Sequence, residues 1–147
     1  MLEIKAAIQI QKSPQEVFEA IADPKKMSNY FISRGSGRMV EGAQVFWKFP
    51  EFDFEFPIRV GRMVPGQYIS YYWESDHTEL LVEISLEPVS NGDTLVTVTE
   101  KSRNNDPAGI NWLKQNTEGW ANFLACLKAY LDHGINLRTG AFDFLRK

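Results

Sequence analysis

The chain has 147 residues, of which 44% are hydrophobic and 24% charged, and its formal net charge at pH 7 is -3. This length suits one domain, and the composition is typical of a folded globular protein rather than a disordered chain. The acidic balance disfavours a nucleic-acid-binding protein, which normally carries a basic face. The single cysteine, Cys126, excludes a disulfide within the chain and fits a reducing compartment.

The first residues do not have the pattern of a signal peptide. Glu3 and Lys5 interrupt the apolar positions, so a continuous apolar core is missing. No apolar run approaches the roughly 20 residues that a transmembrane helix needs. We therefore expect a cytoplasmic protein that neither inserts into a membrane nor binds nucleic acid.

Residues 2–10 alternate between apolar and polar side chains, which predicts a half-buried strand. Ser13 and Glu16 then have the spacing of a capping box, with Pro14 at the first helical position, so a short helix follows. Asp23-Pro24 repeats the start signal and predicts a second short helix. The inward side chains of this second segment are Met27, Tyr30 and Phe31.

Residues 33–38 (SRGSGR) are expected to form a flexible loop, followed by five strands. The strands are separated by turn residues and are predicted at 43–49, 54–60, 67–74, 78–86 and 94–101. Short connections imply an antiparallel meander. Alternation predicts an apolar inner face made of Val45, Trp47, Phe49, Phe54, Phe56, Ile58, Val60, Ile69, Tyr71, Trp73, Leu80, Val82, Ile84 and Leu86.

A long final helix is expected from Asp106-Pro107 to a C-cap at Gly134, with a break before Thr117 left open. Its apolar stripe predicts packing against the sheet, which gives an α+β class. Gly119 lies on the flank of that stripe and costs about 1 kcal/mol relative to alanine. We favour the interpretation that Gly119 lets a bulky sheet residue approach; the alternative is that it leaves room for a pocket.

Several motifs resemble the SRPBCC superfamily, also described as START-like, helix-grip or birch-pollen-allergen-like. The motifs are Ser-Pro-x-Glu-Val-Phe at 13–18, Ala-Ile-Ala-Asp-Pro at 20–24, the aromatic meander, and Gly119-Trp120, Phe123-Leu124 and 127–131 in the final helix. Within the superfamily, the chain is most similar to the bacterial group that resembles the C-terminal domain of the activator of heat-shock-protein-90 ATPase. The resemblance extends to Gly134 and is specific for the fold rather than for a function.

The resemblance implies a helix-grip fold, in which a curved antiparallel sheet of about six or seven strands wraps around the final helix. It implies a START-like domain over 1–134, with a tail over 135–147 that packs on the domain or on a partner chain. It also implies a hydrophobic cavity between sheet and helix. The expected lining is Trp47, Phe49, Phe56, Ile58, Tyr71, Trp73, Val82, Asn116, Trp120, Phe123, Leu124 and Leu127. The expected rim is Tyr30, Phe31, Arg34 and Arg38.

The sequence offers few catalytic or metal-binding motifs. His77 and His133 stand in no ligand spacing, so we expect no metal and no cofactor. Glu100 has the parity of an inward residue, and we interpret it as a satisfied polar group, paired with an arginine, rather than a catalyst. Asn116 lies centrally on the inner stripe and must find a partner, for which sheet backbone, a water and a ligand stay open.

Three functions are compatible with these observations. We favour the binding of a small hydrophobic or aromatic molecule in the cavity. The alternatives are a protein-interaction domain that acts on a chaperone, as the activator does, and a cofactor-free enzyme of the cyclase or aromatase type. No nucleophile–base pair can be named, so we lean against an enzyme. An exposed strand edge and an apolar tail make a homodimer compatible with the sequence.

Overall fold

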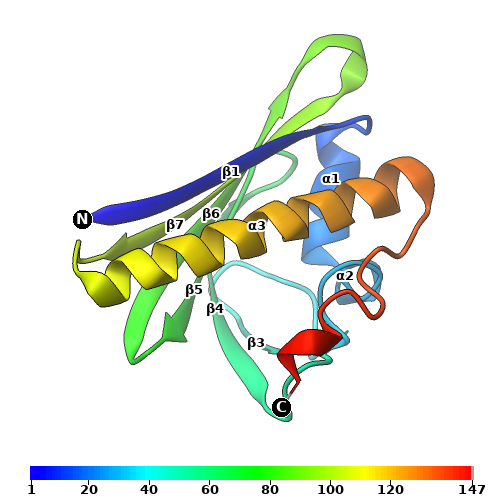
Figure 1. The fold of residues 1–147 in the computed structure, drawn as a ribbon. Helices are drawn as coiled ribbons and strands as arrows, with labels where there is room; N and C mark the ends of the chain where they lie inside the picture. The colour runs from blue at the N-terminus through cyan, green and yellow to red at the C-terminus, as the bar shows by residue number, and fades with distance from the viewer. Residues whose placement is uncertain (147) are drawn as a thin grey trace.

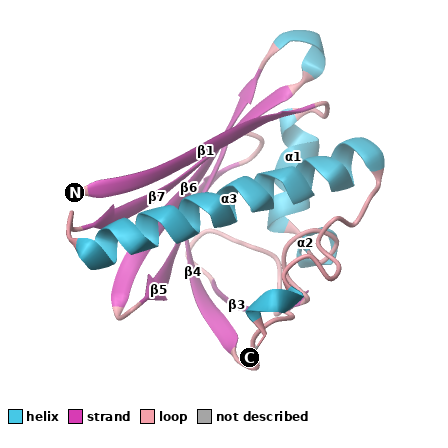
Figure 2. Cartoon of the chain, in the orientation of Figure 1, coloured by secondary structure: helices cyan, strands magenta, loops and turns pink. Residues whose placement is uncertain are grey.

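The computed structural model describes residues 1–146 and shows one curved sheet with a long helix lying across its concave face (Figure 1). Two short helices follow the first strand, so the α+β helix-grip fold is confirmed (Figure 2). In chain order the elements are β1 (Leu2–Ile10), α1 (Pro14–Ala22), α2 (Pro24–Met27), β2 (Arg34–Gly35), β3 (Gln44–Lys48), β4 (Glu55–Val64), β5 (Tyr68–Ser75), β6 (Thr78–Pro88), η1 (Ser90–Gly92), β7 (Thr94–Arg103), α3 (Pro107–His133) and η2 (Asp143–Leu145).

The sheet has seven strands in the order β1-β7-β6-β5-β4-β3-β2, and neighbouring strands are antiparallel. Strands β2 to β7 form a meander, and β1 pairs with β7 at the far edge. The register of β4 against β5 shifts between Val60 and Met63. Because such a bulge bends the strand and increases its twist, it contributes to the curvature that accommodates the helix.

Helix α3 has a capping residue at each end, Asp106 and Gly134. The side chain of Asp106 accepts a hydrogen bond from the Gly109 N–H at 2.7 Å, and Gly134 ends the helix with φ of 65°. A left-handed C-cap of this kind favours glycine. The helix runs through Thr117 without a break. Its packing face lies against β1 and β7 and buries Trp112, Trp120, Phe123, Leu124, Cys126 and Leu127.

The strand predictions are confirmed to within a few residues, with two local corrections. Residues 33–38 are not simply a loop, because Arg34 and Gly35 pair with β3. Phe54 was expected to face inward, but it is 56% exposed because β4 begins one residue later, at Glu55. In the part of the chain that the structure describes, no helix is long and apolar enough to cross a bilayer.

The contact between α3 and the sheet can be tested at Leu127, which is 0% exposed. Leu127→Ala removes buried methyl groups and leaves a cavity, so we expect the free energy of unfolding to fall by about 2–5 kcal/mol. Ile110→Ala is the matched control, since Ile110 lies on the same helix and is 43% exposed. Its effect should stay within about 0.5 kcal/mol. Urea denaturation measures both, and equal losses would contradict the packing described here.

Candidate functional site

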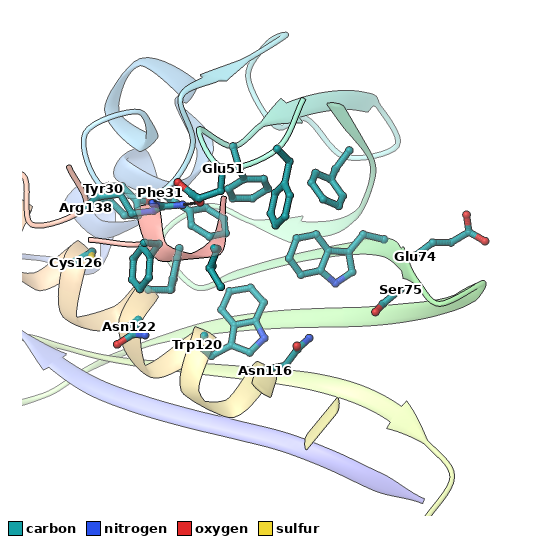
Figure 3. Close-up of a pocket in the computed structure, with 18 residues that line it drawn as sticks. Tyr30, Phe31, Glu51, Glu74, Ser75, Asn116, Trp120, Asn122, Cys126 and Arg138 are labelled. Atoms are coloured by element: carbon teal, nitrogen blue, oxygen red, sulfur yellow. Dashed lines mark hydrogen bonds and ion pairs between the residues drawn. The ribbon is translucent and has the colours of Figure 1, made fainter. Parts of the chain in front are cut away.

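A cavity of about 310 Å³ lies between the sheet, the segment after α2, helix α3 and the C-terminal tail (Figure 3). Nine of its eighteen lining residues are aromatic, and the exposed surface of the wall is mostly apolar. The residues that line it are Tyr30, Phe31, Phe49, Glu51, Phe52, Phe56, Trp73, Glu74, Ser75, Asn116, Gly119, Trp120, Asn122, Phe123, Cys126, Arg138, Phe142 and Leu145.

The rings of the aromatic wall pack against one another, some edge to face and others tilted. The ring of Phe31 lies 5.0 Å from that of Phe49 and 4.7 Å from that of Phe123, both nearly perpendicular. Trp73, from the sheet, and Trp120, from α3, lie 5.8 Å apart. Such arrangements suit the charge distribution of aromatic rings and hold each ring in a defined orientation.

Behind this wall, one buried carboxylate joins the sheet to the helix. Glu100 of β7 is 0% exposed. Its Oε2 accepts the indole N–H of Trp73 at 2.8 Å, and its Oε1 accepts the indole N–H of Trp120 at 2.9 Å. Asn116 adds a third donor to Oε1 at 3.0 Å. Three donors on an acceptor-only carboxylate fix the orientation of both indoles and of the amide.

These hydrogen bonds identify the partners of the two inward-facing polar residues, Glu100 and Asn116. Glu100 faces inward as expected, but the expected arginine partner is wrong, because its partners are two indoles and an amide. Asn116 was expected to meet backbone, water or ligand, and instead it donates to Glu100. Within residues 1–146, no group of three His, Cys, Asp or Glu side chains is placed to hold a metal ion.

Two buried tyrosines have strongly perturbed hydroxyl groups. Burial, with the nearby Tyr130 as a smaller cause, raises the pKa of Tyr30 well above its usual value, and its hydroxyl donates to the Ala20 carbonyl at 2.8 Å. Burial, followed by the negative charge of Glu100, raises the pKa of Tyr71 well above its usual value. Both hydroxyls therefore stay protonated, and neither can serve as a base at neutral pH.

The thiol of Cys126 lines the cavity and is a poor nucleophile there. Burial raises its pKa, while the charge of Arg138 acts in the opposite direction with smaller effect. Since the thiolate is the reactive form, a raised pKa lowers reactivity at neutral pH. Cys126 is therefore a weak nucleophile at neutral pH.

Residues of the tail close one end of the cavity. The guanidinium of Arg138 donates to Glu51 through both terminal nitrogens, at 2.6 and 3.0 Å, and the two side chains are 13% and 3% exposed. The same guanidinium lies 4.6 Å from the ring centre of Phe142. Figure 3 shows this ion pair at one end of the cavity, with Glu74 and Ser75 at the other. The tail is thus anchored to the loop between β3 and β4.

The structure brings half of the expected lining to the cavity. Six of the expected residues line it, namely Phe49, Phe56, Trp73, Asn116, Trp120 and Phe123. Six others lie in the solid core and do not line it, which corrects the prediction for Trp47, Ile58, Tyr71, Val82, Leu124 and Leu127. These strand and helix positions point inward, but neighbouring side chains cover them.

Of the four residues expected at the rim of the cavity, two line it and two do not. Tyr30 and Phe31 line the cavity, whereas Arg34 and Arg38 do not. Arg38 instead pairs with Glu19 at 2.8 Å, away from the site. The arginine that does line the cavity is Arg138, which the sequence did not indicate.

Gly119 also lines the cavity, and a methyl group built there would meet nothing within 4 Å. The favoured interpretation, in which a bulky sheet residue packs on Gly119, is therefore wrong. The glycine leaves open space. The other lining residues that the sequence did not indicate are Glu51, Phe52, Glu74, Ser75, Asn122, Cys126, Arg138, Phe142 and Leu145. Most lie in loops or in the tail, where no periodicity marks an inward position.

The family model described as activator of Hsp90 ATPase homolog 1-like protein matches residues 11–132. The chain belongs to this family. The match ends just before the end of α3, so the tail that closes the cavity lies beyond it. No curated protein matches the chain.

Solved structures show the same fold in other proteins. The SSP2350 protein from Staphylococcus saprophyticus is 31% identical, with a TM-score of 0.83 over 93% of this chain and 96% of its own. DynU16, from the dynemicin biosynthetic locus, is 24% identical, with a TM-score of 0.80 over 91% of this chain and 48% of its own. The Aha1 dimer from Colwellia psychrerythraea is 20% identical, with a TM-score of 0.78 over 91% and 98%. The last two support the fold alone.

The anchoring of the tail can be tested with Arg138→Met. This change removes the guanidinium and leaves the Glu51 carboxylate without its partner, which favours detachment of the tail so that Glu51 becomes hydrated. We expect amide hydrogen exchange over 135–146 to become about tenfold faster or more. Arg146→Met is the matched control, since its pair with Asp143 is 57% and 60% exposed and should contribute little. Unchanged exchange in Arg138→Met would refute the anchor.

Proposed function

We propose that this member of the family binds a small hydrophobic or aromatic molecule in the cavity between the sheet and α3. The observation that carries the proposal is a cavity of about 310 Å³ with a mostly apolar wall, half of whose residues are aromatic, beside a helical glycine with open space around it. This volume lies at the lower end of the usual range for small-molecule sites, about 300–1,000 Å³.

The rigidity of the wall supports the same function. Trp73, Trp120 and Asn116 are fixed by hydrogen bonds to Glu100, so the cavity does not close simply by rotation of these side chains. A preformed apolar site loses little conformational entropy when a ligand enters. At the end opposite the Arg138–Glu51 ion pair, Ser75 adds a polar group that can orient a guest.

A second candidate function follows from the family description. A domain similar to an Hsp90 ATPase activator is a candidate for binding a chaperone of that class through its surface. Stimulation of the ATPase of an Hsp90 homologue by the purified protein would support this candidate, and it does not require an open cavity.

Binding in the cavity can be tested with N-phenyl-1-naphthylamine, an uncharged apolar fluorescent dye. We expect saturable binding and thermal stabilisation, which amounts to about 2.7 kcal/mol when the free dye is at 100 times its Kd. Gly119→Leu places a side chain at the cavity and should weaken dye binding by about tenfold or more, which corresponds to about 1.4 kcal/mol.

The control is Ala121→Leu, a similar enlargement at an exposed position of α3 that does not line the cavity. It should leave the affinity unchanged. Gly119→Ala should raise the free energy of unfolding by about 1 kcal/mol, because alanine favours helix and the space is open. Absence of saturable dye binding to the unchanged protein would overturn the proposed function.

A further inference from the structure

The cavity has a buried charge behind its wall, and within residues 1–146 no counter-ion pairs with it. Glu100 is 0% exposed, and the hydrogen-bond donors on its carboxylate are the neutral groups of Trp73, Trp120 and Asn116. It takes part in none of the ion pairs found among residues 1–146. Hydrogen bonds stabilise such a carboxylate but leave its net negative charge in place.

The other charged groups at the cavity contribute little net charge to its interior. Arg138 is the one cation among the lining residues that the structure describes, and both of its terminal nitrogens are held by Glu51. Glu74 is exposed and points away from the aromatic cluster (Figure 3). Glu100 is therefore the main source of an unbalanced field inside the cavity.

The wall that separates Glu100 from the cavity is one that attracts cations. Trp73 and Trp120 direct their N–H edges to the carboxylate while their rings line the cavity. The face of an indole attracts a positive charge, and a hydrogen bond from its N–H to a carboxylate polarises the ring in the same sense. Further rings around the same space belong to Tyr30, Phe31, Phe49, Phe56 and Phe123.

The same cavity disfavours a negatively charged ligand. It loses its hydration on entry and lies near a like charge in a medium of low dielectric constant, where the repulsion is strong. Among the described lining residues the cation is Arg138, and pairing with it means displacing Glu51, whose side chain is only 3% exposed. A displaced, buried carboxylate is costly.

We propose that the cavity selects aromatic ligands that carry a positive charge over those that carry a negative charge, and that Glu100 sets this preference. The ligand class is an aryl or arylalkyl ammonium compound. This inference rests on the proposed function, because it specifies the chemistry of the molecule that the cavity holds.

Three naphthalene derivatives test the preference by isothermal titration calorimetry: naphthalen-2-ylmethyl-trimethylammonium, the neutral 2-naphthalenemethanol and the anion 2-naphthylacetate. We expect the cation to bind about tenfold or more tightly than the anion, with the neutral compound between them. Equal affinities, or tighter binding of the anion, would overturn the inference while leaving the proposed function intact. Failure of all three compounds and of the neutral dye would overturn the proposed function itself.

Glu100→Gln assigns the preference to its source. The amide oxygen can still accept from Trp120 and Asn116, the two donors on Oε1, whereas the indole of Trp73 loses its acceptor. We expect the ratio of cation to anion affinity to fall toward one, and the affinity of the neutral compound reports any loss that comes from movement of Trp73. Glu118→Gln, which removes an exposed charge of α3 at a position that does not line the cavity, should leave the ratio unchanged. An unchanged ratio in folded Glu100→Gln would contradict the assignment.

A measurement on the unchanged protein covers the case in which Glu100→Gln does not fold. Salt screens exposed charges strongly and buried charges weakly. The affinity ratio should therefore persist between low and high sodium chloride concentration. A ratio that disappears at high salt would assign the preference to the net surface charge of -3 and overturn the role of Glu100.

Discussion

The acceptance of three hydrogen bonds by the buried Glu100 carboxylate is the constraint on which the site depends. Two donors come from α3, Trp120 and Asn116, and one comes from β5, Trp73. The carboxylate, itself 0% exposed, thus links the helix to the sheet across the hollow between them. An ion in such a place is tolerated because each donor offsets part of the desolvation penalty. The same bonds prevent the two indoles from rotating into the cavity.

The cavity remains open because contacts with other residues fix the side chains that line it. The ring of Phe31 packs edge to face against those of Phe49 and Phe123. The hydroxyl of Tyr30 is fixed by its hydrogen bond to the Ala20 carbonyl. Gly119 contributes no side chain where the helix passes the opening. The tail covers one end without entering it, because Arg138 is bound to Glu51. Most of the wall lies within the family match, which ends at residue 132, and Arg138, Phe142 and Leu145 of the tail follow it.

Alternation and capping signals in the sequence were sufficient for the strands, α1 and the ends of α3, because these features are local. Val45 and Ile58 are buried as their parity indicates. The lining of the cavity was less predictable from the sequence. Alternation along a strand indicates which side chains point inward, but not which of them border the cavity. Tyr71 and Trp73 share a face of β5, yet only Trp73 lines the cavity. The partners of Glu100 lie 16, 20 and 27 residues away in the sequence, and nothing local distinguishes an indole partner from a guanidinium.

The placement of the tryptophans has a practical consequence. Two of the four tryptophans of the chain line the cavity, and both share one carboxylate. Indole emission is sensitive to nearby charge and to contact with other rings, so the protein contains its own optical reporter at the position of interest. Ligand binding can thus be followed by tryptophan fluorescence without a label. A movement of the Glu100 carboxylate will change the same emission spectrum.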